Sequence, residues 1–184
     1  TEQVQRRREV EDREETLSKV LSTSADGVLL ADVDGEFTYA NPAAEEMLGL
    51  EESAIAGRSY RDPAWGITDP EGRDFPDEEL PVARVLRTGE PVEMVEHAVQ
   101  RPDGTRRVLS VNAAPLYGPE REVQGVVASL RDVTEERERR QALEESEARY
   151  RTLVETMAEA TLTLDADGHI TFANAAAEEM LGLE

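Results

Sequence analysis

The sequence contains no cysteine, and Lys19 is the only lysine among its 184 residues. Without cysteine there are no disulfides, thiolate metal sites or cysteine nucleophiles, and no cofactor can be attached through a cysteinyl adduct. No apolar run approaches the roughly 20 residues that a membrane-spanning helix needs, and no apolar signal-peptide segment opens the sequence. We therefore expect a cytoplasmic segment that makes no contact with a membrane.

The charge is one-sided, because 41 acidic residues outnumber 20 basic ones and the net charge is −21. Such a field repels nucleic-acid phosphates and anionic lipids, so neither is an expected partner. Residues 17–133 carry −11 and residues 152–184 carry −7, which places the acidity on folded parts rather than on a tail. This charge is typical of a halophile, where high salt screens the repulsion, and it also occurs in ordinary acidic bacterial proteins.

The sequence repeats itself at an offset of 133 residues. Asp34–Glu51 and Asp167–Glu184 are identical at 14 of 18 positions, and the same offset aligns the charged segments that precede them. A period of this length is the size of a domain. The repeat therefore predicts a fragment of a tandem array, with a linker helix at 1–16, a complete domain at 17–134, a second linker helix at 135–152 and the N-terminal part of a second domain at 153–184.

The order of elements in the first domain indicates its fold class. Asp34-Gly35 is a strong hairpin turn signal, and Asn41-Pro42 predicts the capped start of a helix. Strands segregated from a central block of helices are typical of an α+β fold, here a five-stranded antiparallel sheet with helices on one face. The expected strands are 27–32, 36–40, 92–100, 105–115 and 122–132, and the expected helices are 43–48 and 78–88.

Short motifs follow one another along this domain in a fixed order. They are Ala25-Asp26-Gly27, Asp34-Gly35, Ala40-Asn41-Pro42-Ala43-Ala44-Glu45, Leu48-Gly49, Arg101-Pro102-Asp103-Gly104-Thr105, Pro115-Leu116 and Asp132-Val133-Thr134. Together they resemble the PAS family of sensory domains over residues 17–134, and over residues 150–184 as an N-terminal portion. The resemblance implies a sheet cupped by helices, with an apolar pocket between them.

Strand and helix periodicity predicts which residues line that pocket. Polar contacts with a ligand are expected from Ser110, Asn112 or Trp65, and Trp65 is read either as core or as a lid. We expect a small, colourless, apolar or aromatic ligand; the alternative is that the same side chains simply fill the core. The predicted lining residues are Val28, Leu30, Met47, Leu48, Trp65, Val85, Leu86, Leu109 and Val111.

Pockets of PAS domains can hold haem, flavin or another chromophore. Flavin and chromophore adducts of the family need a cysteine, and its haem-binding members usually use a histidine on the helical side of the pocket. The helix expected at 78–88 has no histidine. His97 is interpreted as a surface or partly buried strand residue and His169 as a tolerant turn residue, so no haem, flavin adduct or metal is expected.

Two junctions are candidates for relaying a signal. The resemblance assigns Asn41 to capping its helix and tying the first hairpin to it. Asp132 or Thr134 can accept hydrogen bonds from the free N–H groups at the start of the outgoing helix. In the linker segments the apolar residues Val10 and Leu17, and likewise Leu143 and Tyr150, lie seven apart, which predicts a dimeric coiled coil; a solvated single helix is the alternative.

No phosphate-binding loop, nucleophile elbow or metal motif is found, so we expect no catalytic residues. The predicted function is a sensory module of a multi-domain signalling protein. Its expected partners are a second copy of the chain, adjacent PAS domains, and a histidine kinase or transcriptional regulator as output. The alternative is a PAS domain that binds no ligand and serves for dimerisation and relay.

Overall fold

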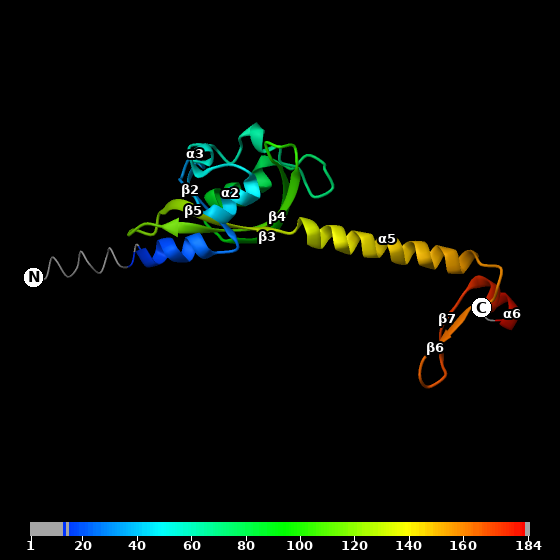
Figure 1. Cartoon of the computed structure of the whole chain (residues 1–184). Coiled ribbons are helices and arrows are strands. Elements are labelled where there is room, and N and C mark those ends of the chain that lie inside the picture. Colours follow the sequence, from blue (N-terminus) through cyan, green and yellow to red (C-terminus); the bar gives the residue numbers. More distant parts are fainter. Residues whose placement is uncertain (1–12, 14, 183–184) are drawn as a thin grey trace, which may run out of the picture. The chain divides into compact units, whose positions relative to one another are not determined.

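The computed structural model describes residue 13 and residues 15–182 (Figure 1). Most of the linker helix expected at residues 1–16 lies outside this part of the chain, and residues 15–23 are helical. The chain divides into two compact units at the boundary between Thr134 and Glu135. In the part of the chain that is described, no helix combines the length and the apolar character that crossing a bilayer requires.

The first unit is built on an antiparallel sheet in the order β2-β1-β5-β4-β3, and this confirms the expected α+β fold. Helices and short 3-10 turns occupy the stretch between the second and third strands (Figure 1). The strands are β1 (Gly27–Ala31), β2 (Phe37–Ala40), β3 (Val92–Gln100), β4 (Arg106–Tyr117) and β5 (Val123–Asp132). The other elements are α2 (Pro42–Leu48), α3 (Glu52–Ile55), η1 (Pro63–Trp65), η2 (Asp77–Glu79) and α4 (Pro81–Thr88).

Local sequence explains the limits of α2. The side chain of Asn41 accepts a hydrogen bond from the N–H of Ala44, and Pro42 fills the first helical position. The helix ends at Gly49, whose φ of 68° lies in the left-handed region that favours glycine, and its N–H donates to the carbonyl of Glu45. The one-turn helix α3 was not predicted, because four residues are too few to show helical periodicity.

The core lies between one face of the sheet and the helices α2 and α4. Buried side chains of alternate strand positions, including Leu29, Leu109 and Leu130, form a single cluster with Leu48 of α2 and Val85 of α4. A second, smaller cluster occupies the other side of the sheet, near the start of the outgoing helix. It consists of Ala98, Val108 and Val133.

The second unit consists of α5 (Thr134–Thr156, whose first residue lies in the first unit), β6 (Leu162–Leu164), β7 (Ile170–Ala173) and α6 (Ala175–Leu181). No residue of α5 is buried. Ion pairs one helical turn apart, Arg139 with Glu135 and Arg140 with Glu136, stabilise its first half by a few tenths of a kcal/mol each. The hairpin β6–β7 and the helix α6 repeat β1–β2 and α2 at the offset seen in the sequence.

Candidate ligand pocket and helix junctions

An apolar cavity of about 60 Å³ lies between the sheet and the helices of the first unit. It is less than half the size of the apolar cavity of about 150 Å³ that holds benzene in an engineered protein. A molecule of more than a few heavy atoms therefore enters only if lining side chains move. The lining residues are Leu29, Phe37, Leu48, Tyr60, Trp65, Ile67, Leu80, Pro81, Val82, His97, Val99, Leu109, Val111, Ala128 and Leu130.

Four of the residues predicted from the sequence line this cavity: Leu48, Trp65, Leu109 and Val111. The indole of Trp65 lies edge-on to the ring of Phe37 at 5.9 Å, and only 5% of its surface is exposed. Trp65 is thus a core residue that also forms part of the cavity wall.

The structure corrects the prediction for β1, where Leu29 rather than Val28 or Leu30 lines the cavity. Val28 and Leu30 are half-buried at the alternate positions of the strand. A Cβ at Gly27 would lie 3.0 Å from the Cα of Ala44, so α2 packs directly on the face that Gly27 and Leu29 share. The prediction was out by one residue because every residue of this strand is small or apolar and the sequence shows no alternation.

Three further predicted residues, Met47, Val85 and Leu86, lie outside the cavity lining. Val85 is fully buried in the core, whereas Met47 and Leu86 are only partly buried and pack against it. Met47 lies on α2, and Val85 and Leu86 lie on α4. On such short helices the apolar positions look equivalent in the sequence, although only some of them face the cavity.

The polar contacts predicted from Ser110 and Asn112 are also corrected. Both alternate with the cavity-lining residues Leu109 and Val111 on β4, so their side chains lie on the opposite face of the sheet. The carbonyl of the Asn112 side chain accepts a hydrogen bond of 2.7 Å from the N–H of Met94.

The structure also brings His97, a polar residue, into the cavity wall. It pairs with Leu109 across β3 and β4, is 7% exposed, and has a ring nitrogen, Nδ1, that is buried without a hydrogen-bond partner. Burial lowers the pKa of His97 to about 4, so the imidazole is neutral at pH 7. His97 was interpreted from the sequence as a surface or partly buried strand residue, and its burial in the cavity wall corrects this.

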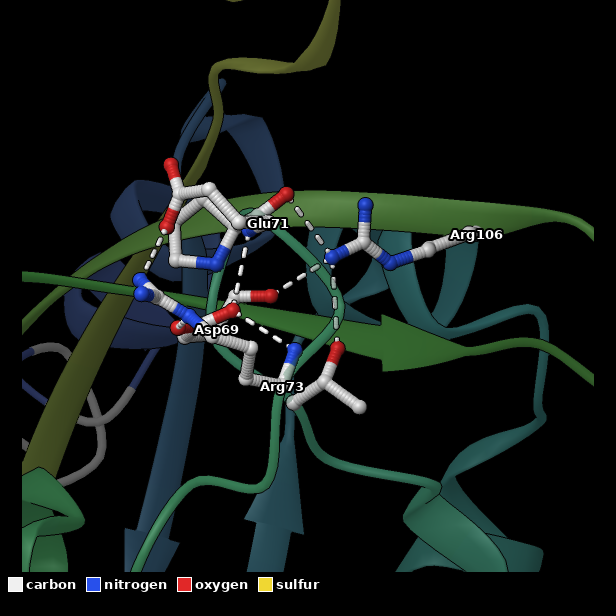
Figure 2. Close-up of polar contacts among 6 residues, drawn as sticks. Asp69, Glu71, Arg73 and Arg106 are labelled. Carbon is white, nitrogen blue, oxygen red and sulfur yellow. Dashed lines mark hydrogen bonds and ion pairs between the residues drawn. The ribbon is translucent and has the colours of Figure 1, made fainter.

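The loop that supplies Trp65 and Ile67 to the cavity wall is tied to β3. Thr68 and Ala98 exchange backbone hydrogen bonds of 3.1 and 2.8 Å. One nitrogen of the Arg106 guanidinium contacts the Thr68 hydroxyl at 3.2 Å and the carbonyls of Asp69 and Pro70 at 2.6 and 2.9 Å (Figure 2). Arg106 therefore anchors the tip of this loop to β4, while Arg73 pairs with Asp69 and Glu71 within the loop.

Asp69, Glu71 and Arg73 form a local network within this loop. The carboxylate of Asp69 accepts from the backbone N–H of Glu71 and from the backbone and side chain of Arg73 (Figure 2). The other end of the Arg73 guanidinium lies 3.1 Å from Glu71. Because Arg73 is largely exposed, these pairs shape the turn and contribute little to overall stability.

The incoming helix is joined to the domain through Asn41, a fully buried residue. Its side-chain oxygen accepts from the N–H of Val28 at 2.7 Å and of Ala44 at 3.0 Å. Its amide nitrogen donates to the carbonyls of Leu21 at 2.8 Å and Asp26 at 3.1 Å. Asn41 therefore caps α2 as expected, and it also holds the last turn of the helix that precedes the domain.

The outgoing helix is joined to the sheet through Asp132 and Thr134. One carboxylate oxygen of Asp132 accepts from the N–H of Thr134 at 2.9 Å and from its hydroxyl at 2.6 Å. The Thr134 hydroxyl in turn accepts from the N–H of Val108 on β4 at 2.9 Å. The other carboxylate oxygen lies 3.5 Å from Arg107. The start of α5 is thus hydrogen-bonded to both β4 and β5.

The second unit repeats the incoming junction. Asn174 accepts from Thr161 at 2.8 Å and Ala177 at 3.0 Å, and it donates to the carbonyls of Val154 and Glu159 at 2.9 Å each. All four partners stand at the offset of 133 residues from those of Asn41. The carbonyl of Val154 belongs to the last turn of α5, so this helix is also held at its C-terminal end.

The β6–β7 turn holds a group of potential metal ligands. Oxygen and nitrogen atoms of Asp165, Asp167 and His169 lie within 4.8 Å of one another, and all three residues are exposed. Asp165 accepts from the backbone of Asp167 and His169 at 2.9 Å each, which is what the turn itself requires. His169 is therefore a turn residue, and this group carries no metal assignment.

The first unit is thus an α+β domain with an apolar cavity and with hydrogen bonds that join both the incoming and the outgoing helix to it. The sequence matches the family model described as PAS fold over residues 21–138, and the model described as PAS domain over residues 148–184. The first match spans more than half of the chain. The chain belongs to the PAS family, and it is a sensory and signalling module.

Solved PAS structures share the fold. The PAS domain of an HTR-like protein from Haloarcula marismortui is 23% identical, with a TM-score of 0.54 over 70% of this chain and 98% of that one. A PAS domain from Colwellia psychrerythraea is 18% identical, with a TM-score of 0.53 over 66% and 97%. An RNA-binding light-oxygen-voltage receptor is 24% identical, with a TM-score of 0.57 over 73% and 37%. None of the curated proteins compared with this chain matches it.

Proposed function

We propose that the first unit senses a small molecule in its cavity and passes the change in occupancy to α5. The module then acts without catalysing a reaction, as one part of a larger signalling protein whose output is a histidine kinase or a transcriptional regulator. Family membership supports the sensory role, and the position of the cavity beside the helix junction supports the route.

The observation that carries this proposal is the pairing of Leu109 with Asp132 across β4 and β5. Leu109 is part of the cavity wall, and its chain neighbour Val108 donates to Thr134. Asp132 holds the same threonine from the other strand. A molecule that displaces Leu109 therefore acts on β4 one residue away from the hydrogen bond that fixes the start of α5.

We propose a colourless ligand rather than haem or flavin. The cavity wall offers one imidazole and the chain has no thiol, so a covalent flavin adduct has no attachment point. Pockets that hold drug-sized ligands are typically about 300–1,000 Å³, several times the volume of this cavity. An aromatic ligand would require Trp65, Phe37 or a neighbouring side chain to move.

The second candidate function is dimerisation and signal relay by a PAS domain that binds no ligand of its own. The small cavity favours this reading, because the surrounding residues already form a continuous core. On α5 the exposed side chains of Leu143 and Tyr150 lie seven residues apart, and the exposed Met157 follows at the same spacing directly after the helix ends. Such a stripe suits a parallel coiled coil with a second copy of the chain, and we propose this homodimer for either function.

Native mass spectrometry of the purified full chain separates the two functions. A bound mass in stoichiometric amount supports ligand sensing, whereas the bare mass of the chain supports relay alone. The relay itself is tested with a spin label on Glu144→Cys, a unique attachment site because the sequence has no other cysteine. A distance between the two labels of a dimer that changes on ligand removal supports transmission through α5, and an unchanged distance contradicts it.

A further inference from the structure

His97 lines the cavity and carries a polar atom without a hydrogen-bond partner. Its Nδ1 is buried and has no partner. The other polar side chains of the cavity wall each have a partner: the hydroxyl of Tyr60 accepts from Arg61 at 2.8 Å, and the indole N–H of Trp65 donates to the carbonyl of Ser59 at 2.8 Å. A buried polar group without a partner is destabilising, so a molecule that completes its bonding binds more tightly.

We propose that the cavity binds a small uncharged molecule bearing one hydroxyl group, and that this hydroxyl forms a hydrogen bond with the imidazole of His97. The inference rests on the proposed ligand-sensing function and names the chemical class of the ligand and the residue that recognises it.

The chemistry of the site selects a hydroxyl group. A neutral imidazole has one nitrogen that donates and one that accepts, and either can carry the proton. A hydroxyl can both donate and accept, so it pairs with Nδ1 in either form of the ring. An amine or a carboxylate would bring a charge into a wall that has no charged side chain to balance it.

The surroundings of His97 set the size and the apolar character of the site. Phe75 packs against the imidazole, with ring centres 5.8 Å apart, and covers it on the side of the loop. The cavity of about 60 Å³ accommodates a molecule of a few heavy atoms without rearrangement. A short-chain alcohol meets both conditions, because its alkyl part contacts the leucine and valine side chains while its hydroxyl reaches His97.

The test compares two probes that differ in hydrogen bonding, ethanol and xenon, on the full chain labelled with ¹⁵N-histidine and methyl ¹³C. The chain has two histidines, and the exposed His169 serves as an internal reference. We expect both probes to shift methyl signals of Leu29, Leu109 and Val111. Only ethanol is expected to shift the Nδ1 signal of His97, because xenon cannot form a hydrogen bond.

Variants separate recognition by His97 from simple filling of the cavity. In His97→Leu we expect xenon binding to be retained and ethanol binding to weaken by about tenfold, the effect of one lost hydrogen bond. His169→Gln is the matched control, and it leaves both affinities unchanged. Should His97→Leu fail to fold, the shift of the His97 Nδ1 signal in the unmodified protein still decides the question.

The outcomes distinguish this inference from the function on which it rests. Both probes can bind while ethanol leaves the His97 Nδ1 signal unchanged, as when an internal water is already bound to Nδ1. That result overturns the inference but not the ligand-sensing function. If neither probe shifts any methyl signal of the cavity wall, the cavity admits no molecule of this size, and both the inference and the sensing of a ligand without rearrangement of the wall are overturned.

Discussion

The side-chain amide of Asn41 donates a hydrogen bond of 2.8 Å to the carbonyl of Leu21, twenty residues earlier in the chain. This bond connects the last turn of the incoming helix to the cap of α2, and Asn174 makes the equivalent bond to Val154. A helix end normally leaves its last carbonyls without partners inside the helix. Here one of them is bound by the following domain, which fixes where the helix ends relative to the sheet.

The first prediction concerns the substitution Asn41→Asp. The acceptor oxygen for Val28 and Ala44 is kept, but the donor is replaced by a carboxylate oxygen that faces the carbonyls of Leu21 and Asp26. Two buried acceptors lose their donor and meet a negative charge, so we expect the free energy of unfolding to fall by about 3 kcal/mol. Urea unfolding monitored by Trp65 fluorescence measures the change.

Asn174→Asp is the matched control for this prediction. It breaks the equivalent network of the second unit and is expected to leave the transition reported by Trp65 unchanged, since that residue belongs to the first unit. Equal stability of Asn41→Asp and the unmodified protein would show that the amide donor contributes nothing, and the junction would then not hold the incoming helix.

The second prediction concerns pH. Burial lowers the pKa of His97 from 6.5 to about 4 in the folded protein, so between these values the unfolded chain binds the extra proton. The contribution of neutral His97 is complete above pH 6.5 and is lost as the pH falls toward 4. At about 1.4 kcal/mol for each unit of pKa, the loss amounts to about 3 kcal/mol.

Comparison with His97→Gln isolates this contribution, because the acidic side chains titrate alike in both proteins and their effect cancels. We expect the unfolding free energy of the unmodified protein to fall relative to that of His97→Gln between pH 6.5 and pH 4. His169→Gln, which changes an exposed histidine, should follow the unmodified protein throughout. Parallel curves for His97→Gln and the unmodified protein over this range would refute the burial of His97 in its neutral form.

The third prediction is a dimer held by the linker helices. On α5 the exposed residues Leu143 and Tyr150 are 60% and 67% accessible, so they gain burial only from a partner. We expect a dimer at micromolar concentration in molar KCl, and a monomer for Leu143→Glu combined with Tyr150→Glu. Light scattering after size-exclusion chromatography measures the mass, with Glu144→Gln as the control on a neighbouring position. A monomeric unmodified chain would contradict the coiled coil.

The fourth prediction concerns salt. With a net charge of −21, the folded chain repels itself, and the screening length grows from about 3 Å at 1 M salt to about 10 Å at 0.1 M. If the acidity is an adaptation to high salt, the melting temperature should drop markedly on dilution from molar KCl. A melting temperature that stays constant across this range would favour an ordinary acidic protein.

Much of the fold could be predicted from the sequence, because its boundaries are marked by residues with strong local preferences. Asp34-Gly35 marks the hairpin, Asn41-Pro42 and Gly49 mark the two ends of α2, and the third strand was expected at the residues it occupies. These signals act within a few residues of the chain and need no tertiary contact.

The candidate site was less predictable, because tertiary packing decides it. The strand that contains Val28 and Leu29 is apolar on both faces, so only its contact with α2 shows which face is inward. His97 became a site residue through the loop of Ile67 and Phe75, which covers it from more than twenty residues away. Depth of burial of this kind leaves no local pattern in the sequence.

The central claim is that occupancy of the cavity alters the junction at Thr134, and hydrogen exchange of the Val108 amide tests it most directly. Ala128→Val adds methyl groups to the cavity wall and mimics occupancy, whereas Ala114→Val adds the same groups to β4 at a position outside the lining. Thr134→Val removes the acceptor of the Val108 amide and gives its exchange rate without the bond.

We predict that the exchange rate of the Val108 amide in Ala128→Val differs from that of the unmodified protein by about threefold or more. The change is measured against the Thr134→Val rate, and it can lie in either direction. Ala114→Val is expected to leave the rate unchanged. A rate in Ala128→Val equal to that of the unmodified protein, with ethanol and xenon no longer entering the filled cavity, would contradict the coupling between the cavity and α5.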